Sequence, residues 1–232
     1  MRSFWLLVLA ACAPAEGDSH LRAKAADHGP LVLELFTSQG CSSCPPAERV
    51  LARLAHDPSL APLAFHVDYW DDLGWADPFA SPAWTARQHA YARALGDRVY
   101  TPELVVGGAA GMVGSNTREI ERAIERAERP ARLAATATWR TEAVEIAAAA
   151  PADAEVLVAV WQDGLVTKVS RGENAGAALA SERVVRRLER VAAPGQRGTI
   201  TIPLDASWHA GGAVVFAQSR TRRIVASALL TR

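Results

Sequence analysis

Apolar and polar positions follow two different periods along this chain. Between residues 30 and 129, unbroken apolar runs alternate with segments whose apolar residues recur every three or four positions. The unbroken runs predict buried strands, and the recurring ones predict helices with one buried face. Predicted strands lie at 31–37, 63–67, 101–106 and 111–113; predicted helices follow Cys44, run from Ser81 to Gly96, and run from Asn116 to Pro130. This alternation predicts an α/β unit, a sheet with helices packed on its faces.

Beyond residue 130 the helical period disappears. Short alternating runs follow one another, separated by turn residues such as Asp163-Gly164 and Pro194-Gly195. The predicted strands lie at 133–139, 143–148, 156–161, 184–191, 199–204, 213–218 and 224–229. Six to eight short strands with few helix signals predict a small all-β, sandwich-like domain.

The first residues have the pattern of an export signal. Met1-Arg2 precedes the apolar segment 3–11, and small polar residues follow to position 29. Two processing sites stay open, because residues 9–12 resemble a lipoprotein box that would lipidate Cys12, while residues 13–15 fit ordinary signal cleavage. We therefore expect a signal peptide and flexible tether at 1–29, and a location in the periplasm or, through a lipidated Cys12, on the outer membrane.

The amino-acid composition limits the classes of function that this protein can have. Half of the residues are hydrophobic, and 25 basic residues balance 25 acidic ones with no long run of one sign. This balance gives no indication of a nucleic-acid partner. No stretch approaches the roughly 20 apolar residues that span a bilayer.

The most specific chemical feature is Cys41-Ser42-Ser43-Cys44, between a predicted strand and a predicted helix. A helix N-terminus carries unpaired N–H groups and partial positive charge, which favour the reactive thiolate. A second thiol in reach can resolve the mixed disulfide formed by the first. We expect Cys41 as nucleophile and Cys44 as resolving thiol, both reachable from solvent; the alternative is an inert structural disulfide.

The element order, the CxxC pair and the Thr101-Pro102 dipeptide together resemble a thioredoxin-like domain. Four segments look like a bacterial family of exported thioredoxin-like proteins that carry a domain-of-unknown-function label: residues 34–47, 65–75, 100–102 and 171–174. The resemblance implies an α/β thioredoxin-like domain at 30–130, followed by the sandwich-like domain at 131–232. It also implies a cis Pro102 facing Cys41. Gly40 and the Ser-Ser pair depart from thioredoxin, so the redox direction does not transfer.

Other candidate site residues each have a structural alternative. Thioredoxin keeps a buried acid six residues before its first cysteine, and Glu34 lies seven before Cys41, so it is either the proton acceptor or a paired strand carboxylate. Trp70 and Trp75 lie in an aromatic-rich insert that could bind substrate beside Thr101, or simply cover a helix.

Three functions compete at this point. The first is a thiol–disulfide oxidoreductase of the cell envelope, acting on protein thiols or disulfides and using no cofactor. The second is a soft-metal module in which the two thiolates and His66 hold copper. The third is a non-catalytic interaction protein. Arg171, Glu173 and Asn174 either close over the thiols or form a solvated turn.

Overall fold

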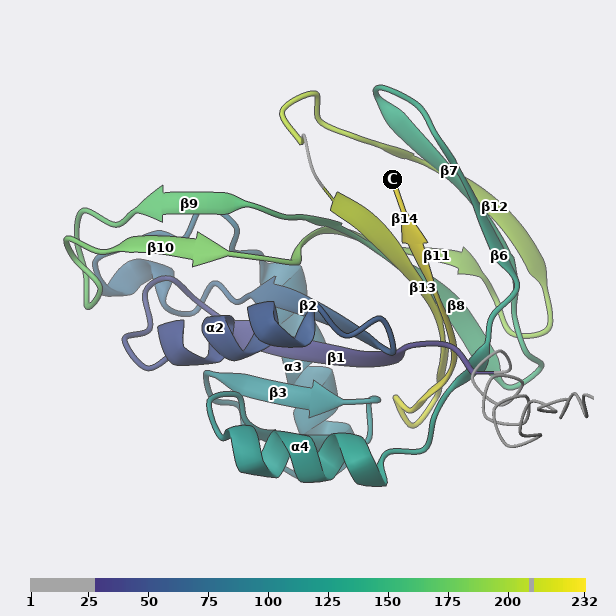
Figure 1. Ribbon diagram of the computed structural model, residues 1–232, viewed down its shortest axis with the longest axis horizontal. Coiled ribbons are helices and arrows are strands. Elements are labelled where there is room, and N and C mark those ends of the chain that lie inside the picture. The colour runs from purple at the N-terminus through teal and green to yellow at the C-terminus, as the bar shows by residue number, and fades with distance from the viewer. Residues whose placement is uncertain (1–27, 209–210) are drawn as a thin grey trace, which may run out of the picture.

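The structure, a computed structural model, describes residues 28–208 and 211–232. The predicted signal peptide and Cys12 lie outside the described residues. Within them, strands from both halves of the chain form one mixed sheet of nine strands (Figure 1). In spatial order these are β4 (Ala110–Val113), β3 (Glu103–Val106), β1 (Leu31–Thr37), β2 (Leu60–His66), β11 (Val184–Ala192), β8 (Ala154–Gln162), β13 (Gly211–Ser219), β14 (Ile224–Thr231) and β5 (Ala131–Arg132).

The remaining described elements cover this sheet or extend from it. The helices are α2 (Pro45–Leu54), α3 (Pro82–Leu95), α4 (Thr117–Arg126) and the 3-10 turn η1 (Asp71–Leu73). A three-stranded sheet contains β12 (Arg197–Pro203), β7 (Ala143–Ala149) and β6 (Ala135–Trp139), and a two-stranded hairpin contains β9 (Leu165–Lys168) and β10 (Ala178–Ser181).

The predicted fold class, an α/β thioredoxin-like domain followed by a small all-β sandwich-like domain, is wrong. Strand β2 is not the edge of a separate sheet, because β11 pairs with it in parallel and the Ala64 N–H donates to the Arg183 carbonyl at 2.8 Å. The nine-stranded sheet therefore runs through both halves, with three α-helices among the described residues. The predicted domain limits stay a prediction, since a shared sheet does not decide whether either half folds alone.

Strand alternation assigns each side chain to one of two faces of the sheet. Helix α3 covers one face, where Phe36 and Phe65 of the first half and Phe216 of the second enter one apolar cluster. Helices α2 and α4 cover the opposite face over β1 and β3. Farther along, the sheet β12–β7–β6 packs over Val156, Val158 and Val215. These layers are visible in Figure 1.

The predicted boundaries of α3 and the predicted start of α4 are confirmed, whereas α4 ends at Arg126 and not at the predicted Pro130. Ser81 caps α3 by accepting a hydrogen bond from the Ala83 N–H, and Gly96 ends the helix with a φ of 67°. Asn116 caps α4 through the Glu119 N–H. The strand at 31–37 also has its predicted limits.

The β9–β10 hairpin was not predicted. It leaves the sheet between β8 and β11, and Figure 1 shows it reaching over α2. Strand β10 lies beside α2, so the loop at 169–177 arrives at the segment that carries the cysteines. The fold thus positions the site between β1, α2 and this hairpin.

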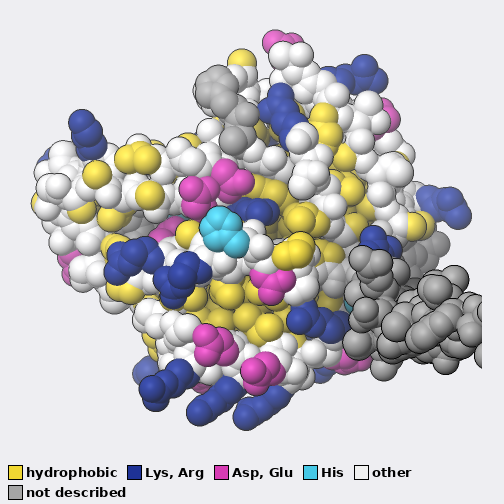
Figure 2. Space-filling view, in the orientation of Figure 1, with side chains coloured by type: hydrophobic (Ala, Val, Ile, Leu, Met, Phe, Trp, Pro, Cys, Tyr) yellow, Lys and Arg dark blue, Asp and Glu magenta, His cyan; other side chains and the backbone are white. Residues whose placement is uncertain are grey.

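The face drawn in Figure 2 mixes basic and acidic side chains and shows no broad field of one sign. Along α4, arginines at positions 118, 122 and 126 alternate with glutamates at 119, 121 and 125. None of the described helices is long and apolar enough to cross a membrane.

Candidate functional site

The two cysteines form a disulfide in the loop between β1 and α2. Their Cα atoms lie 5.4 Å apart, and Cys44 is the N-cap of α2, whose first turn contains Pro45 and Pro46. Proline suits this turn because the N–H it lacks would have no partner there. Ser43 Oγ lies 3.2 Å from Cys41 Sγ. The helix therefore begins after Cys44, and Cys41 lies in the preceding turn.

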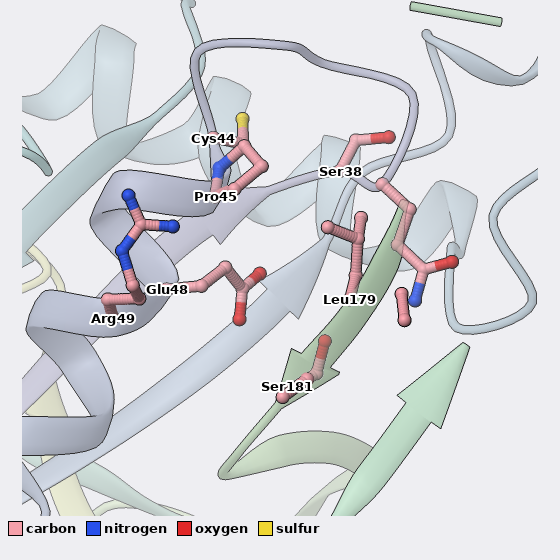
Figure 3. Close-up of a pocket in the computed structure, with 10 residues that line it drawn as sticks. Ser38, Cys44, Pro45, Glu48, Arg49, Leu179 and Ser181 are labelled. Atoms are coloured by element: carbon pink, nitrogen blue, oxygen red, sulfur yellow. The ribbon is translucent and has the colours of Figure 1, made fainter. Parts of the chain in front are cut away.

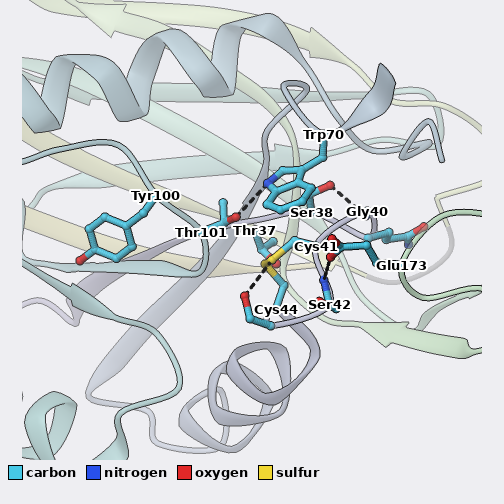
Figure 4. The surroundings of a disulfide bond; sticks show 12 residues. Thr37, Ser38, Gly40, Cys41, Ser42, Cys44, Trp70, Tyr100, Thr101 and Glu173 are labelled. Atoms are coloured by element: carbon cyan, nitrogen blue, oxygen red, sulfur yellow. Dashed lines mark hydrogen bonds between the residues drawn. A yellow bond between two sulfur atoms is a disulfide. The ribbon is translucent and has the colours of Figure 1, made fainter. Parts of the chain in front are cut away.

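Trp70 and Thr101 lie on one side of the disulfide (Figure 4). The Trp70 indole N–H donates to Thr101 Oγ1 at 2.9 Å. The bond between Thr101 and Pro102 is cis, as the resemblance implied. Gly40 allows this approach, because a Cβ at that position would lie 3.0 Å from Trp70 Cβ. Two of the three predicted substrate-binding residues thus lie beside the cysteines.

The β9–β10 hairpin holds the other side of the loop. Asn174 donates from Nδ2 to the Cys41 carbonyl at 3.0 Å and to the Gln39 carbonyl at 2.9 Å. Glu173 accepts from the Ser42 N–H at 2.9 Å, and these bonds from Ser42 lower the pKa of the exposed Glu173 carboxyl. Of the two alternatives for this loop, these contacts favour closure over the cysteine segment, and the solvated turn that was the default expectation is not what the structure has.

Gln39 joins the hairpin to the predicted aromatic residues. Its side chain donates to Thr167 Oγ1 at 3.0 Å and accepts from the Trp75 indole N–H at 3.2 Å. Trp75 is therefore linked to the cysteine segment through Gln39 and does not touch the disulfide itself; it lies close to Gly172 of the hairpin loop, where an added Cβ would be 3.1 Å from Trp75 Cβ. Gly172 has a φ of 74°, a conformation in which a side chain would be strained.

Both sulfurs are enclosed by this arrangement. Cys41 is 0% exposed and Cys44 is 1% exposed, so the expectation that solvent reaches them is wrong for this conformation. The reason is the hairpin, which the local sequence pattern did not reveal. Reaction with a partner requires the loop at 169–177 or the Trp70 side to move.

Glu34 does not meet the cysteines. It lies on the α3 face of the sheet, whereas Cys44 and α2 lie on the other face. Arg87 binds its carboxylate through Nε at 2.5 Å and through a terminal nitrogen at 2.9 Å, and the Tyr91 hydroxyl donates to it as well. Burial alone would lower the pKa of Arg87, but the facing Glu34 carboxylate outweighs it and raises that pKa. The structure therefore places Glu34 in a buried ion pair.

A different buried acid lies beside Cys44. Glu48, one helical turn after it, lines a cavity of about 190 Å³ together with Cys44, Ser38 and Ser181 (Figure 3). Thr37 Oγ1 donates to Glu48 Oε1 at 2.9 Å, whereas Oε2 has no hydrogen-bond partner among the described residues. Sequence reasoning missed Glu48, although the i, i+4 spacing from Cys44 puts both on one side of a helix.

His66 and Asp77 extend this acidic site. Asp77 Oδ2 lies 2.7 Å from His66 Nδ1 and also accepts from the Gln39 N–H at 2.8 Å. His66 Nε2 lies 3.7 Å from Glu48 Oε1. His66 is 0% exposed. Asp77 was also missed in the sequence, because it lies in an irregular loop without periodicity.

The charges in this cluster set the direction of each pKa shift. Burial raises the pKa of Glu48 and outweighs the nearby His66, which lowers it. Burial lowers the pKa of His66, but Asp77 and Glu48 together outweigh burial and raise it. Burial raises the pKa of Asp77, and the charge and hydrogen bonds around it, first of all His66, bring it below its usual value. His66 and Asp77 therefore favour an imidazolium–carboxylate pair beside a carboxyl that holds its proton more tightly than usual.

The predicted copper arrangement is not assembled here. Among residues 28–208 and 211–232, no group of three or more His, Cys, Asp and Glu side chains has the geometry of a metal site. His66 directs one ring nitrogen to Asp77 and the other to Glu48.

Comparison with known proteins identifies a family whose model matches this chain. The model of a family described as "Protein of unknown function (DUF1223)" matches residues 32–218. The chain belongs to the DUF1223 family. The predicted resemblance to a domain-of-unknown-function family is thereby confirmed. The match includes the cysteines, Glu48, His66, Asp77 and the hairpin, so the site lies within the part that defines the family.

One similar structure is an X-ray crystal structure of an Agrobacterium tumefaciens protein, determined as a structural genomics target. It is 30% identical, with a TM-score of 0.68, and the alignment covers 88% of this chain and 95% of that one. None of the curated proteins matches this chain. These relationships support the fold as a whole and assign no activity.

Proposed function

We propose that this DUF1223 protein is a dithiol oxidoreductase that exchanges the Cys41–Cys44 disulfide with thiols of partner proteins. The observation that carries the proposal is the bonded pair itself, at the N-terminus of α2 and with no other cysteine among the described residues. A lone CxxC disulfide closes only a very short loop and contributes little as a scaffold. A redox role explains its placement between Trp70, Thr101 and the β9–β10 hairpin.

The exchange has two steps. A partner thiolate attacks Cys41 Sγ, the Cys41–Cys44 bond breaks, and Cys44 leaves as a thiolate that takes up a proton. A second partner thiolate then attacks the partner sulfur of the mixed disulfide and releases Cys41. The partner dithiol is oxidised to a disulfide, and the protein disulfide is reduced to a dithiol by the same two electrons. The reverse sequence reduces a partner disulfide.

Cys41 suits the role of attacked sulfur because its loop is held by removable contacts. The bonds from Asn174, Glu173 and Ser42 join two segments more than 130 residues apart in sequence and involve no apolar core. Each such bond contributes about 1 kcal/mol, so breaking the bonds to the cysteine segment requires only a few kcal/mol. The enclosed disulfide is therefore a closed state from which a partner gains access.

The proposed setting is the cell envelope. Disulfides persist outside the cytosol, and the export signal expected at residues 1–29 fits that compartment. Partner proteins with exposed thiols or disulfides are the proposed substrates. Attachment to a membrane through a lipidated Cys12 belongs to the same proposal.

The deciding measurement is the reduction potential of the Cys41–Cys44 pair, determined by equilibration with defined thiol buffers. We expect a value between about −120 and −270 mV, the range of catalytic dithiols, whereas an inert structural disulfide lies below about −300 mV. A value near the upper limit makes the protein an oxidant, and one near the lower limit makes it a reductant.

An insulin reduction assay tests directly whether the protein catalyses thiol–disulfide exchange. Wild type should accelerate precipitation of reduced insulin, and Cys41→Ser should abolish the acceleration. Equal rates for both, together with a potential below the catalytic range, would reject the redox function. Copper titration of the reduced protein and capture of a partner by Cys41→Ser would then test the metal and interaction alternatives.

A further inference from the structure

We propose that Glu48 is the proton-exchange partner of Cys44, oriented by Thr37 and by a buried His66–Asp77 pair. This inference rests on the proposed dithiol function and adds a catalytic residue to it. Thiol–disulfide exchange at Cys44 needs such a group, because the thiol must lose a proton to attack and the leaving thiolate must regain one. The enclosed sulfurs have no direct access to bulk water.

Position is the first argument. Glu48 lies four residues after Cys44, and helical geometry puts residues with that spacing on neighbouring turns of one face. Both residues line the same cavity of about 190 Å³, in which Figure 3 shows the Glu48 carboxylate projecting from α2 toward β10. A cavity of this volume, with polar side chains in part of its wall, has room for water that links the two groups.

Unused hydrogen-bonding capacity is the second argument. Buried polar atoms are nearly always paired, so each exception requires an explanation. Glu48 Oε2 and His66 Nε2 are two of three buried side-chain atoms without a partner among the described residues, and they belong to neighbouring groups. The Glu48 side chain is only 11% exposed. Its free oxygen is therefore available for a proton from the cavity.

The surrounding charges provide the third argument. Glu48 faces Thr37 from β1, His66 from β2, and the more distant Asp77 from the loop before α3. Arg49 and Ser181 complete the polar part of the cavity wall. Arg186 opposes protonation of His66, but Asp77 and Glu48 outweigh it. Burial stabilises the neutral form of Glu48, and the neighbouring His66 stabilises its anionic form; burial outweighs His66, so the carboxyl beside Cys44 holds its proton more tightly than an ordinary glutamate does.

The proposed proton movement balances in both directions. When a partner thiolate opens the disulfide, Cys44 leaves as a thiolate, and the protonated Glu48 carboxyl transfers its proton to that sulfur. In the reverse reaction, the Glu48 carboxylate accepts the Cys44 proton, and the resulting thiolate attacks Cys41 Sγ of a mixed disulfide and expels the partner thiolate. His66 and Asp77 act as positioning residues that keep the carboxyl facing the cavity.

The test is a rapid-mixing experiment on the reduced full-length protein with a chromogenic aryl disulfide. Attack by Cys41 releases the first coloured thiolate, and attack by Cys44 on the mixed disulfide releases the second. Glu48→Gln preserves shape and the bond from Thr37 but cannot exchange a proton. At neutral pH we expect it to slow the second phase by about 100-fold, a typical contribution of acid–base catalysis, with the first phase nearly unchanged.

The pH dependence and two further variants identify the cause. Above about pH 9, beyond the ordinary pKa of a cysteine thiol, ionisation no longer depends on a nearby base, and the second phase of Glu48→Gln should approach that of wild type. Glu48→Asp retains a titrating carboxyl and should restore much of the rate. Arg53→Gln, in the last turn of the same helix and outside the cavity, changes a charge without removing the proton carrier and should leave the second phase within about threefold.

Three results would overturn the inference: an unchanged second phase in Glu48→Gln, equal slowing of both phases, or a defect that persists at high pH. If Glu48→Gln does not fold, as judged by its melting transition, the proposal is tested with Glu48→Asp in its place. Its second phase must then show a pH midpoint below that of wild type. The proposed function fails separately, because absence of both phases in wild type would reject dithiol exchange before any Glu48 variant is compared.

Discussion

Two buried acidic clusters lie on opposite faces of the same sheet and are satisfied to different degrees. On the α3 face, both oxygens of Glu34 are bonded, by Arg87 and Tyr91, and Gln218 completes the network through the Tyr91 hydroxyl. On the α2 face, Glu48 and His66 each retain an atom without a partner beside a cavity. Complete pairing fixes a structure, whereas incomplete pairing next to a disulfide leaves capacity for chemistry.

The sequence gives no simple way to distinguish the two acids. Glu34 lies in an apolar strand near the cysteines and resembles a catalytic acid, whereas Glu48 lies in an ordinary amphipathic helix. The two acids differ in the face of the sheet on which each side chain lies and in the residues that each contacts on that face. The following predictions test that contrast, beginning with the largest expected effect.

Arg87→Met should lower the free energy of unfolding by about 3–5 kcal/mol, because it leaves the Glu34 carboxylate buried without its cation. Urea denaturation of the oxidised protein measures the change. Arg93→Met, an exposed arginine on the same helix, should change stability by less than about 0.5 kcal/mol. The double variant Glu34→Leu/Arg87→Met should recover much of the loss; if Arg87→Met is as stable as wild type, the cluster is not structural.

Glu103→Gln should stabilise the protein above pH 7. Glu103 is 0% exposed, and burial, only partly offset by the bond from Gln88, raises its pKa from 4.5 to about 7. The folded state therefore holds a proton between these values that the unfolded state has lost, so stability falls as pH rises through that window. The amide removes this pH dependence and should add about 2 kcal/mol at pH 8, before any loss in packing.

Denaturation at pH 4.5 and pH 8 measures the effect of Glu103→Gln. The advantage of the variant should fall to a few tenths of a kcal/mol at the lower pH, where the unfolded carboxyl is about half protonated. Glu125→Gln on the exposed side of α4 provides the matched carboxyl-to-amide control and should show no such dependence. An equal gain at both pH values would contradict the assigned cause.

Asn174→Ala should accelerate reduction of the disulfide by dithiothreitol about tenfold, since losing two hydrogen bonds to the cysteine loop weakens the closed state by roughly 1–2 kcal/mol. Lys168→Ala, on the same hairpin but exposed and without a hydrogen bond to the cysteine segment among those described, should react like wild type. Reduction rates that do not differ would mean that access to the sulfurs comes from the Trp70 side.

Local structure was largely predictable from the sequence. The limits of β1, the caps of α3 and α4, and the position of the cysteines between a strand and a helix follow from apolar runs, capping residues and proline placement. Such signals act over a few residues and are therefore visible in a single chain. The cis Thr101–Pro102 bond came from the family resemblance and not from these patterns.

Long-range structure was not predictable in the same way. Strand β2 is apolar on both faces, which shows that it is buried but not that β11 is its neighbour 120 residues later. The hairpin strands β9 and β10 are short and mixed in character, so neither gave a clear period. Both omissions concern partners that are distant in sequence, and they are the reason for the wrong fold class and for the missed enclosure of the sulfurs.

The distance in sequence between the cysteines and their hairpin has a consequence for biogenesis. A ribosome makes Cys41 and Cys44 well before Glu173 and Asn174, so the nascent chain presents two bare thiols until the final third of the protein exists. An oxidant that meets the chain during this interval can form the Cys41–Cys44 disulfide without displacing the hairpin. Once the hairpin packs over the cysteines, later reaction partners meet a shielded pair. The order of synthesis therefore decides whether that pair is a disulfide or a dithiol when folding is complete.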